Sequence, residues 1–231
     1  MASSSYIAPQ ISYSFINLLL ILTSLQLLSS TQSKSCLTTS SSKVIISGNS
    51  TIFSENRTFV LGFFNTNNES KWYLGIWYAS IPTPTYVWVA NRETPLISLE
   101  SSSLEIDAGK LTVKDNRDSR CDVVWESADP NIDSEGDVKL LEDGDLVVVD
   151  ARGVTVWRSF DFPADTFLPG MNLTVGQMLT CWKSSNDPAP GKYSLRLRPP
   201  DYGEVELLYG GDRTYWTSGK WTGNISPVYR R

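Results

Sequence analysis

Three aspartates flank one short apolar strand near the middle of the chain. Residues 138–160 read VKLLEDGDLVVVDARGVTVWRSF, which places Asp143, Asp145 and Asp150 around a run of leucine and valine. Ionised carboxylates accept hydrogen bonds from hydroxyl groups, so these acids could line a sugar-binding pocket. They also fit the polar ends of a hairpin, because Asp and Gly favour tight turns.

The elements around these acids are predicted to be strands. Asp143-Gly144 and Arg152-Gly153 each lie between short β-branched runs, which is the pattern of a three-strand meander with two turns. An earlier stretch, residues 104–127, repeats this pattern: Gly109 corresponds to Gly144, and the stretch has its own Val-Trp pair at Val124-Trp125.

Tryptophans mark three such units along the chain. They are spaced by 37 and 32 residues, and they are Trp88, Trp125 and Trp157. A period in this range, with turn-rich β segments in each unit, indicates repeated small sheets. We expect three antiparallel sheets with pseudo-threefold symmetry, each directing one of these tryptophans inward as a structural core.

The first unit contains two strands of alternating apolar residues, FVLGFF (59–64) and WYLGIWY (72–78). Trp72, Trp77 and Tyr78 could stack on a sugar ring or pack in the core. No segment after residue 33 shows a helical period, so the fold class is expected to be all-β.

The composition of the sequence changes after Trp157. Residues 159–171 (SFDFPADTFLPGM) are expected to form a linker, because proline stops strands and fixes turns. Four further strands follow, separated by the turn signals NDPAPG, PPDYG and GGDR. We therefore divide the chain into 34–158, the linker 159–171 and a partial second β domain at 172–231. Its small core should leave several side chains incompletely buried: Leu195, Leu197, Leu207, Leu208 and Trp216.

Composition excludes several kinds of chemistry. The chain has no histidine, which removes Ser-His-Asp triads, Cys-His pairs and imidazole metal sites. Its net charge of −5 disfavours nucleic acid as a partner. Cys36, Cys121 and Cys181 are an odd number, so at least one thiol is unpaired or bonds another chain. We expect no metal, no cofactor and no enzymatic activity.

Three further residues have alternative interpretations. Asp161 and Asp165 could be a calcium pair or a glycosidase dyad, or they could belong to proline-rich turns. Arg92 could bind an anion, or it could pair with a carboxylate such as that of Glu93.

The N-terminal 33 residues contain no charged side chain, and residues 15–28 are mostly apolar. We predict a signal peptide at 1–33 rather than an anchoring segment, and hence a secreted chain without a membrane span in its mature form. Five N-x-S/T sequons agree with this prediction, at Asn49, Asn56, Asn68, Asn172 and Asn224.

Six blocks of sequence carry a resemblance to a known family: FVLGFF, WYLGIWY, YVWVANRETPL, VWRSFDFPADTFLPGM, LTCWKSSNDPAPGKYS and YWTSGKWTGN. The chain resembles the extracellular part of plant S-domain receptor-like kinases, the bulb-type lectin receptor family. The resemblance implies a β-prism of three four-stranded sheets, followed by an S-locus glycoprotein-type domain. The family's later modules, including the kinase, have no counterpart here, so the chain resembles a truncated ectodomain.

Mannose-binding relatives of this family use the strand pattern Gln-x-Asp-x-Asn-x-Val-x-Tyr. The matching positions are Leu141, Asp143, Asp145, Val147 and Val149. Only Asp143 and Val147 keep the family residue, and Asp145 can only accept hydrogen bonds where Asn also donates. In the repeat of the second unit no position matches: Ile106, Ala108, Lys110, Thr112 and Lys114. The resemblance implies a weakened sugar site at Asp143, Asp145 and Val147.

We therefore expect a secreted, non-catalytic recognition module. Its partner would be a mannose-type glycan or another receptor ectodomain, in plant cell-surface signalling or recognition of pollen. The alternatives are a receptor fragment without ligand and a decoy that pairs with full-length receptor ectodomains.

Overall fold

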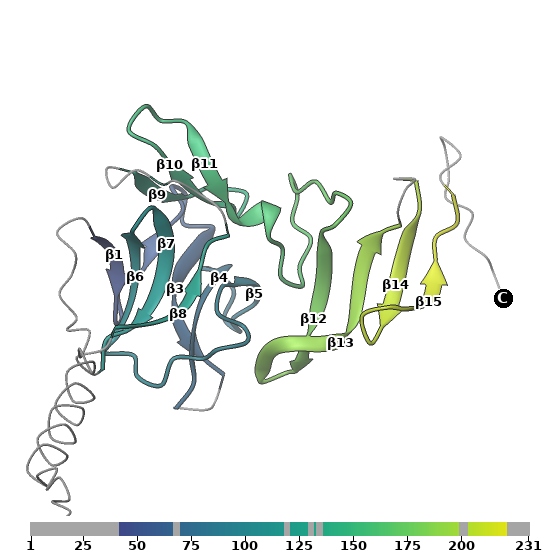
Figure 1. Ribbon diagram of the computed structural model, residues 1–231, viewed down its shortest axis with the longest axis horizontal. Helices are drawn as coiled ribbons and strands as arrows, with labels where there is room; N and C mark the ends of the chain where they lie inside the picture. The colour runs from purple at the N-terminus through teal and green to yellow at the C-terminus, as the bar shows by residue number, and fades with distance from the viewer. Residues whose placement is uncertain are drawn as a thin grey trace, which may run out of the picture. The chain divides into compact units, whose positions relative to one another are not determined.

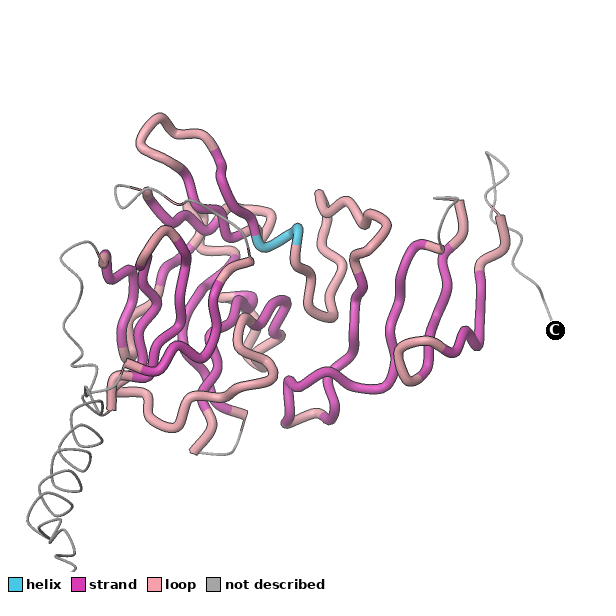
Figure 2. The backbone as a smooth tube through the Cα atoms, in the orientation of Figure 1, coloured by secondary structure: helices cyan, strands magenta, loops and turns pink. Residues whose placement is uncertain are grey.

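The computed structural model describes residues 42–66, 70–117, 121–128, 132, 136–198 and 203–220. These residues form strands and loops, with one short 3-10 helix, η1 (Ser159–Asp161) (Figure 2). The all-β fold class is thereby confirmed. The proposed signal peptide lies outside the described residues.

Three small antiparallel sheets make up the first part of the described chain (Figure 1). The first sheet contains β2 (Ile52–Phe53), β3 (Phe59–Asn65), β4 (Trp72–Tyr78) and β5 (Tyr86–Val89). The second contains β1 (Lys43–Ser47), β6 (Ser102–Asp107), β7 (Lys110–Asp115) and β8 (Asp122–Glu126). The third contains β9 (Asp137–Leu140), β10 (Leu146–Val149) and β11 (Thr155–Arg158), which is the meander expected from the sequence. Among the described residues the third sheet has three strands rather than four.

The three tryptophans meet in the centre of these sheets. The ring centroids of Trp88, Trp125 and Trp157 lie 5.9, 6.1 and 6.2 Å apart, in edge-to-face arrangements. Such arrangements suit the positive edge and negative face of aromatic rings. One tryptophan comes from each sheet, so a single core connects all three.

Alternation of side chains directs one face of the strands into this core and leaves the other face outside it. Leu61 pairs with Ile76 across β3 and β4, and both side chains are fully buried. The glycines Gly62 and Gly75 pair at the next position. A Cβ at Gly75 would lie 2.6 Å from the Phe64 ring, so only glycine lets that ring cross the outer face of the sheet.

The segment expected to be a linker contributes to the same core. Phe160, Ala164 and Leu168 are each at most 6% exposed and pack with the buried residues of the three sheets. The Trp88 indole also donates a hydrogen bond to the Phe162 carbonyl at 3.0 Å. Residues 159–171 are thus held against the three sheets in the structure.

A fourth antiparallel sheet follows, with β12 (Met178–Ser184), β13 (Asp187–Leu197), β14 (Val205–Tyr209) and β15 (Arg213–Thr217) in that order. The expected turn at NDPAPG is shorter than the sequence indicated, because β13 already begins at Asp187. Leu208 is completely buried, so the expectation of incomplete burial was wrong for this residue. Trp216 is 43% exposed, in agreement with that expectation.

Candidate functional site

Asp145 is fully buried, and both of its carboxylate oxygens accept hydrogen bonds from other residues of the chain. Arg158, on the neighbouring strand β11, pairs with it through Nη2 at 2.6 Å and donates from Nε at 2.8 Å. The hydroxyl of Ser159 and the backbone N–H of Phe160 donate to its other oxygen, at 3.0 and 3.1 Å. Burial raises the pKa of Asp145, and the bonds from Arg158 and Phe160 oppose that rise. No oxygen of this carboxylate is left to face a ligand.

The other two positions of the weakened sugar motif also have structural roles. The Asp143 side chain accepts a hydrogen bond from the Asp145 backbone N–H at 3.1 Å, which forms an Asx-type turn. Gly144 follows with φ of +89°, a left-handed conformation that favours glycine. Val147 is 4% exposed and lies between its cross-strand neighbours Lys139 and Arg158. The structure brings these residues together as a hairpin, not as an open pocket.

The corresponding strand of the second unit ends in a buried charge cluster. Lys114 contacts Glu105 at 3.0 Å and Asp107 at 2.7 Å, and the Lys114 and Glu105 side chains are less than a tenth exposed. Burial acts to lower the pKa of Lys114, but the hydrogen bonds that Lys114 donates to the two acids outweigh burial and leave the pKa raised. The ammonium is therefore fixed within the sheet.

The outer face of the first sheet is aromatic and contacts Trp182 of the fourth sheet. Phe64, Tyr73 and Val89 form a buried cluster with Trp77 and Tyr86 against it. Trp182 of β12 stacks on this cluster, with ring centroids 6.5 Å from Phe64 and 5.7 Å from Tyr86. Of the three candidate stacking residues, Trp77 belongs here. Trp72 and Tyr78 pack against the central core.

Arg92 fastens the β12–β13 hairpin to the loop that follows β5. Its Nε donates to the Pro188 carbonyl at 2.7 Å, and its Nη2 donates to the carbonyls of Thr180 and Cys181 at 2.9 and 3.1 Å. The sequence suggested a carboxylate partner, but the hydrogen bonds go to backbone oxygens. Burial lowers the pKa of Arg92, and the nearby Asp165 carboxylate acts in the opposite direction.

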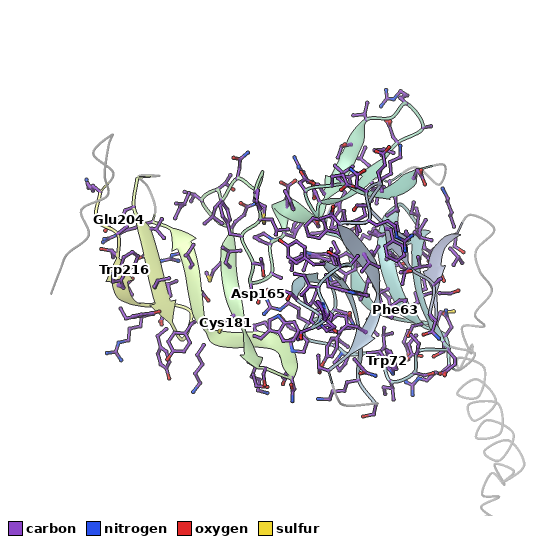
Figure 3. The ribbon with its side chains drawn as sticks, turned by 180° about the vertical axis from the view of Figure 1, so that it is seen from behind. Phe63, Trp72, Asp165, Cys181, Glu204 and Trp216 are labelled. Carbon is purple, nitrogen blue, oxygen red and sulfur yellow. The ribbon has the colours of Figure 1, made fainter. Side chains whose placement is uncertain are left out.

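Asp161 and Asp165 lie in different surroundings. Asp161 is exposed, and its backbone carbonyl accepts a hydrogen bond from Gln177. Asp165 is half-buried beside Arg92, accepts a bond from the Thr166 hydroxyl at 3.3 Å, and has a pKa raised by burial. Figure 3 shows Asp165 next to the strand that carries Cys181. Across the described ranges, no group of three potential metal ligands is found.

A cleft of about 400 Å³ opens beside Arg92. Its walls come from the loop after β5, from β8, from the segment before β12 and from the fourth sheet. They include Arg92, Glu93, Thr94, Trp125, Phe162 and Met178. Sequence reasoning missed this cleft, because its walls come from four separated segments.

The structure also describes three of the five predicted glycosylation sites and two of the three cysteines. Asn49, Asn56 and Asn172 are exposed, whereas Asn68 and Asn224 lie outside the described residues. Cys121 is disulfide-bonded and Cys181 is a free thiol, which confirms that an unpaired cysteine remains. In the part of the chain that the structure describes, no helix is long and apolar enough to cross a membrane.

Three small sheets around one tryptophan-centred core define a lectin-type β-prism. Comparison with known proteins agrees: the model of the D-mannose binding lectin family matches residues 85–188. The "G-type lectin S-receptor-like serine/threonine-protein kinase SD2-2" of Arabidopsis thaliana is 50% identical over 184 residues, covering 79% of this chain and 22% of the kinase. The "S-locus-specific glycoprotein S6" of Brassica oleracea is 36% identical over 193 residues, covering 77% of this chain and 42% of the glycoprotein.

These matches confirm the resemblance seen in the sequence. The chain carries a bulb-type lectin domain homologous to the ectodomains of S-domain receptor-like kinases and to S-locus glycoprotein. It spans about a fifth of the length of the kinases that it matches, and they match over their lectin region. The family model that matches residues 85–188 describes a lectin domain.

Proposed function

We propose that this protein is a secreted, non-catalytic recognition module that binds a glycan or a receptor ectodomain at the plant cell surface. The observation that carries the proposal is the lectin-family match over residues 85–188. The exposed sequons at Asn49, Asn56 and Asn172 support passage through the secretory pathway. Pollen recognition is one setting for such a module.

The buried motif residues bear on how a glycan would bind. Asp145 and Val147 are less than a twentieth exposed, so the proposed sugar site at Asp143, Asp145 and Val147 would have to rearrange before contacting a ligand. A glycan ligand therefore calls for another surface of the domain.

Pairing with a receptor ectodomain is the second candidate, and the last strands of the fourth sheet favour it. Tyr193, Tyr209, Tyr215 and Trp216 are between 37% and 52% exposed on β13, β14 and β15. Exposed aromatic groups of this kind are enriched at protein interfaces. Among the described strands, β15 also has one edge without a neighbour, which offers backbone groups for strand addition. Such pairing would allow the protein to act as a decoy.

Two measurements on the glycosylated, secreted protein test the proposal. A glycan array should show saturable binding, or co-precipitation should recover full-length receptor ectodomains of the same family. Correctly folded protein that binds neither would contradict recognition, and rapid intracellular degradation would contradict secretion.

A further inference from the structure

The cleft beside Arg92 contains hydrogen-bonding groups that the fold does not use. Arg92 donates hydrogen bonds from Nε and Nη2 to three backbone carbonyls, whereas Nη1 has no hydrogen-bond partner among the described residues. Nη1 is therefore free to donate to a ligand that enters the cleft.

A hydrogen-bond acceptor without a partner lines the same cleft. Glu93 lines the cleft, and its carboxylate has no hydrogen bond or ion pair within the described ranges. The Asp165 carboxylate, which acts to raise the pKa of Arg92, forms no salt bridge with it and is not among the residues that line the cleft. A cationic donor, Arg92, and an anionic acceptor, Glu93, therefore line the same cleft without forming an ion pair with each other.

An aromatic wall completes the cleft. The Phe162 ring stacks on Trp157 with an interplanar angle of 9° and remains 43% exposed. Its backbone is fixed by the hydrogen bond from the Trp88 indole to the Phe162 carbonyl. The ring is thus held in place before any ligand arrives, which lowers the entropic cost of binding. Trp125 adds a second aromatic side chain to the same wall.

We infer that this cleft is a binding site for a neutral saccharide unit, a deepening that rests on the recognition function proposed above. Each sugar hydroxyl can accept from the guanidinium and donate to a carboxylate, while the C–H face of the ring packs on Phe162. The volume of about 400 Å³ lies in the usual range for small-ligand pockets. The mixed charge of the walls favours hydroxyl groups over a charged substituent.

The inference is tested by titrating the full secreted protein with methyl α-mannoside, methyl β-glucoside and glucuronate, using calorimetry. Phe162→Ala and Glu93→Gln should each weaken binding of the better neutral probe by about tenfold, the equivalent of losing one good contact to a charged or aromatic group. Phe167→Ala is the matched control, because Phe167 is 55% exposed in the same segment but does not line the cleft. It should bind like the unmodified protein.

The outcomes separate this site from the wider function. Glycan binding that is unchanged in Phe162→Ala and Glu93→Gln would overturn the cleft while leaving recognition intact. Binding of glucuronate more tightly than both neutral probes would overturn the assignment of a neutral ligand. Absence of saturable binding by folded protein would also overturn the cleft, whereas co-precipitation with receptor ectodomains would still decide the proposed function. Glu93 is exposed, so its variant keeps the test valid if Phe162→Ala misfolds.

Discussion

The three-sheet module and the fourth sheet use similar strands but bury them very differently. In the module, residues such as Leu61, Leu74 and Val148 are completely buried around the tryptophan centre. In the fourth sheet, only Leu179 and Leu208 are buried among the large apolar residues that the structure describes. Three sheets that face one another share a core, whereas a single sheet must bury its apolar face against another part of the chain. Strand-forming sequence therefore does not by itself provide stability.

The two regions are joined by specific contacts at one end of the fourth sheet. Arg92 binds carbonyls of β12 and β13, and Trp182 stacks on the aromatic face of the first sheet. The far strands β14 and β15 lack comparable cover among the described residues. The fourth sheet is thus expected to be well ordered at β12 and progressively less stable towards β15.

The sharpest test of the comparison is a pair of tryptophan variants. Trp157→Ala should lower the free energy of unfolding by about 3–5 kcal/mol, because it removes a ring from the centre of the shared core. Trp216→Ala should cost less than about 1 kcal/mol, since its side chain is 43% exposed. Chemical denaturation followed by circular dichroism measures both. Equal losses would show that the fourth sheet is as tightly built as the module.

Weakening the contacts between the three-sheet module and the fourth sheet should destabilise only the fourth sheet. Arg92→Gln leaves backbone carbonyls without their donor, and we expect the docking of β12 and β13 to weaken by about 1–3 kcal/mol. Hydrogen exchange should rise in residues 178–197, and limited proteolysis should then cut within 172–231 while residues 42–160 survive as one block. Arg152→Gln is the control, because the Arg152 side chain is 83% exposed. Comparable cleavage in both halves would contradict independent stability of the module.

Lowering the pH should weaken an ion pair that lies entirely within the fourth sheet. Burial acts to raise the pKa of Glu206, but bonds from Arg196 at 2.6 Å and Thr214 at 2.8 Å outweigh burial and hold the pKa below 4.5. The ionised form is thus favoured by folding, so its contribution is present above pH 4.5 and disappears as pH falls through the lower folded pKa. Glu206→Gln should flatten this loss of protection in β13 and β14, as measured by hydrogen exchange. An unchanged acid profile would show that the pair contributes nothing.

The smallest expected change is at the hairpin of the sugar motif. Asp143→Ala removes one side-chain hydrogen bond to the Asp145 backbone, and should cost about 1 kcal/mol or less. Binding of methyl α-mannoside, measured by calorimetry, should be unchanged because the residue serves the turn. A selective loss of mannoside affinity without loss of stability would instead restore Asp143 as a sugar ligand.

Local patterns were enough to predict much of the module. Alternation in residues 59–64 and 72–78 indicated the strands, and Asp-Gly and Arg-Gly pairs indicated the turns between β9, β10 and β11. The spacing of Trp88, Trp125 and Trp157 predicted one tryptophan per sheet. These features depend on side-chain period and turn chemistry, which the sequence displays directly.

The partners of the candidate site residues depended on the tertiary structure. Sequence left open whether Asp145 faces solvent, and the pairing of β10 with β11 brought Arg158 onto it. Nothing near Arg92 in the sequence indicated that carbonyls about 90 residues later would receive its hydrogen bonds. Composition and periodicity determined the sheets and the kind of core, because those follow from neighbouring residues. Which charges are buried, which aromatic face is covered and where a cleft remains were decided only when distant segments packed together.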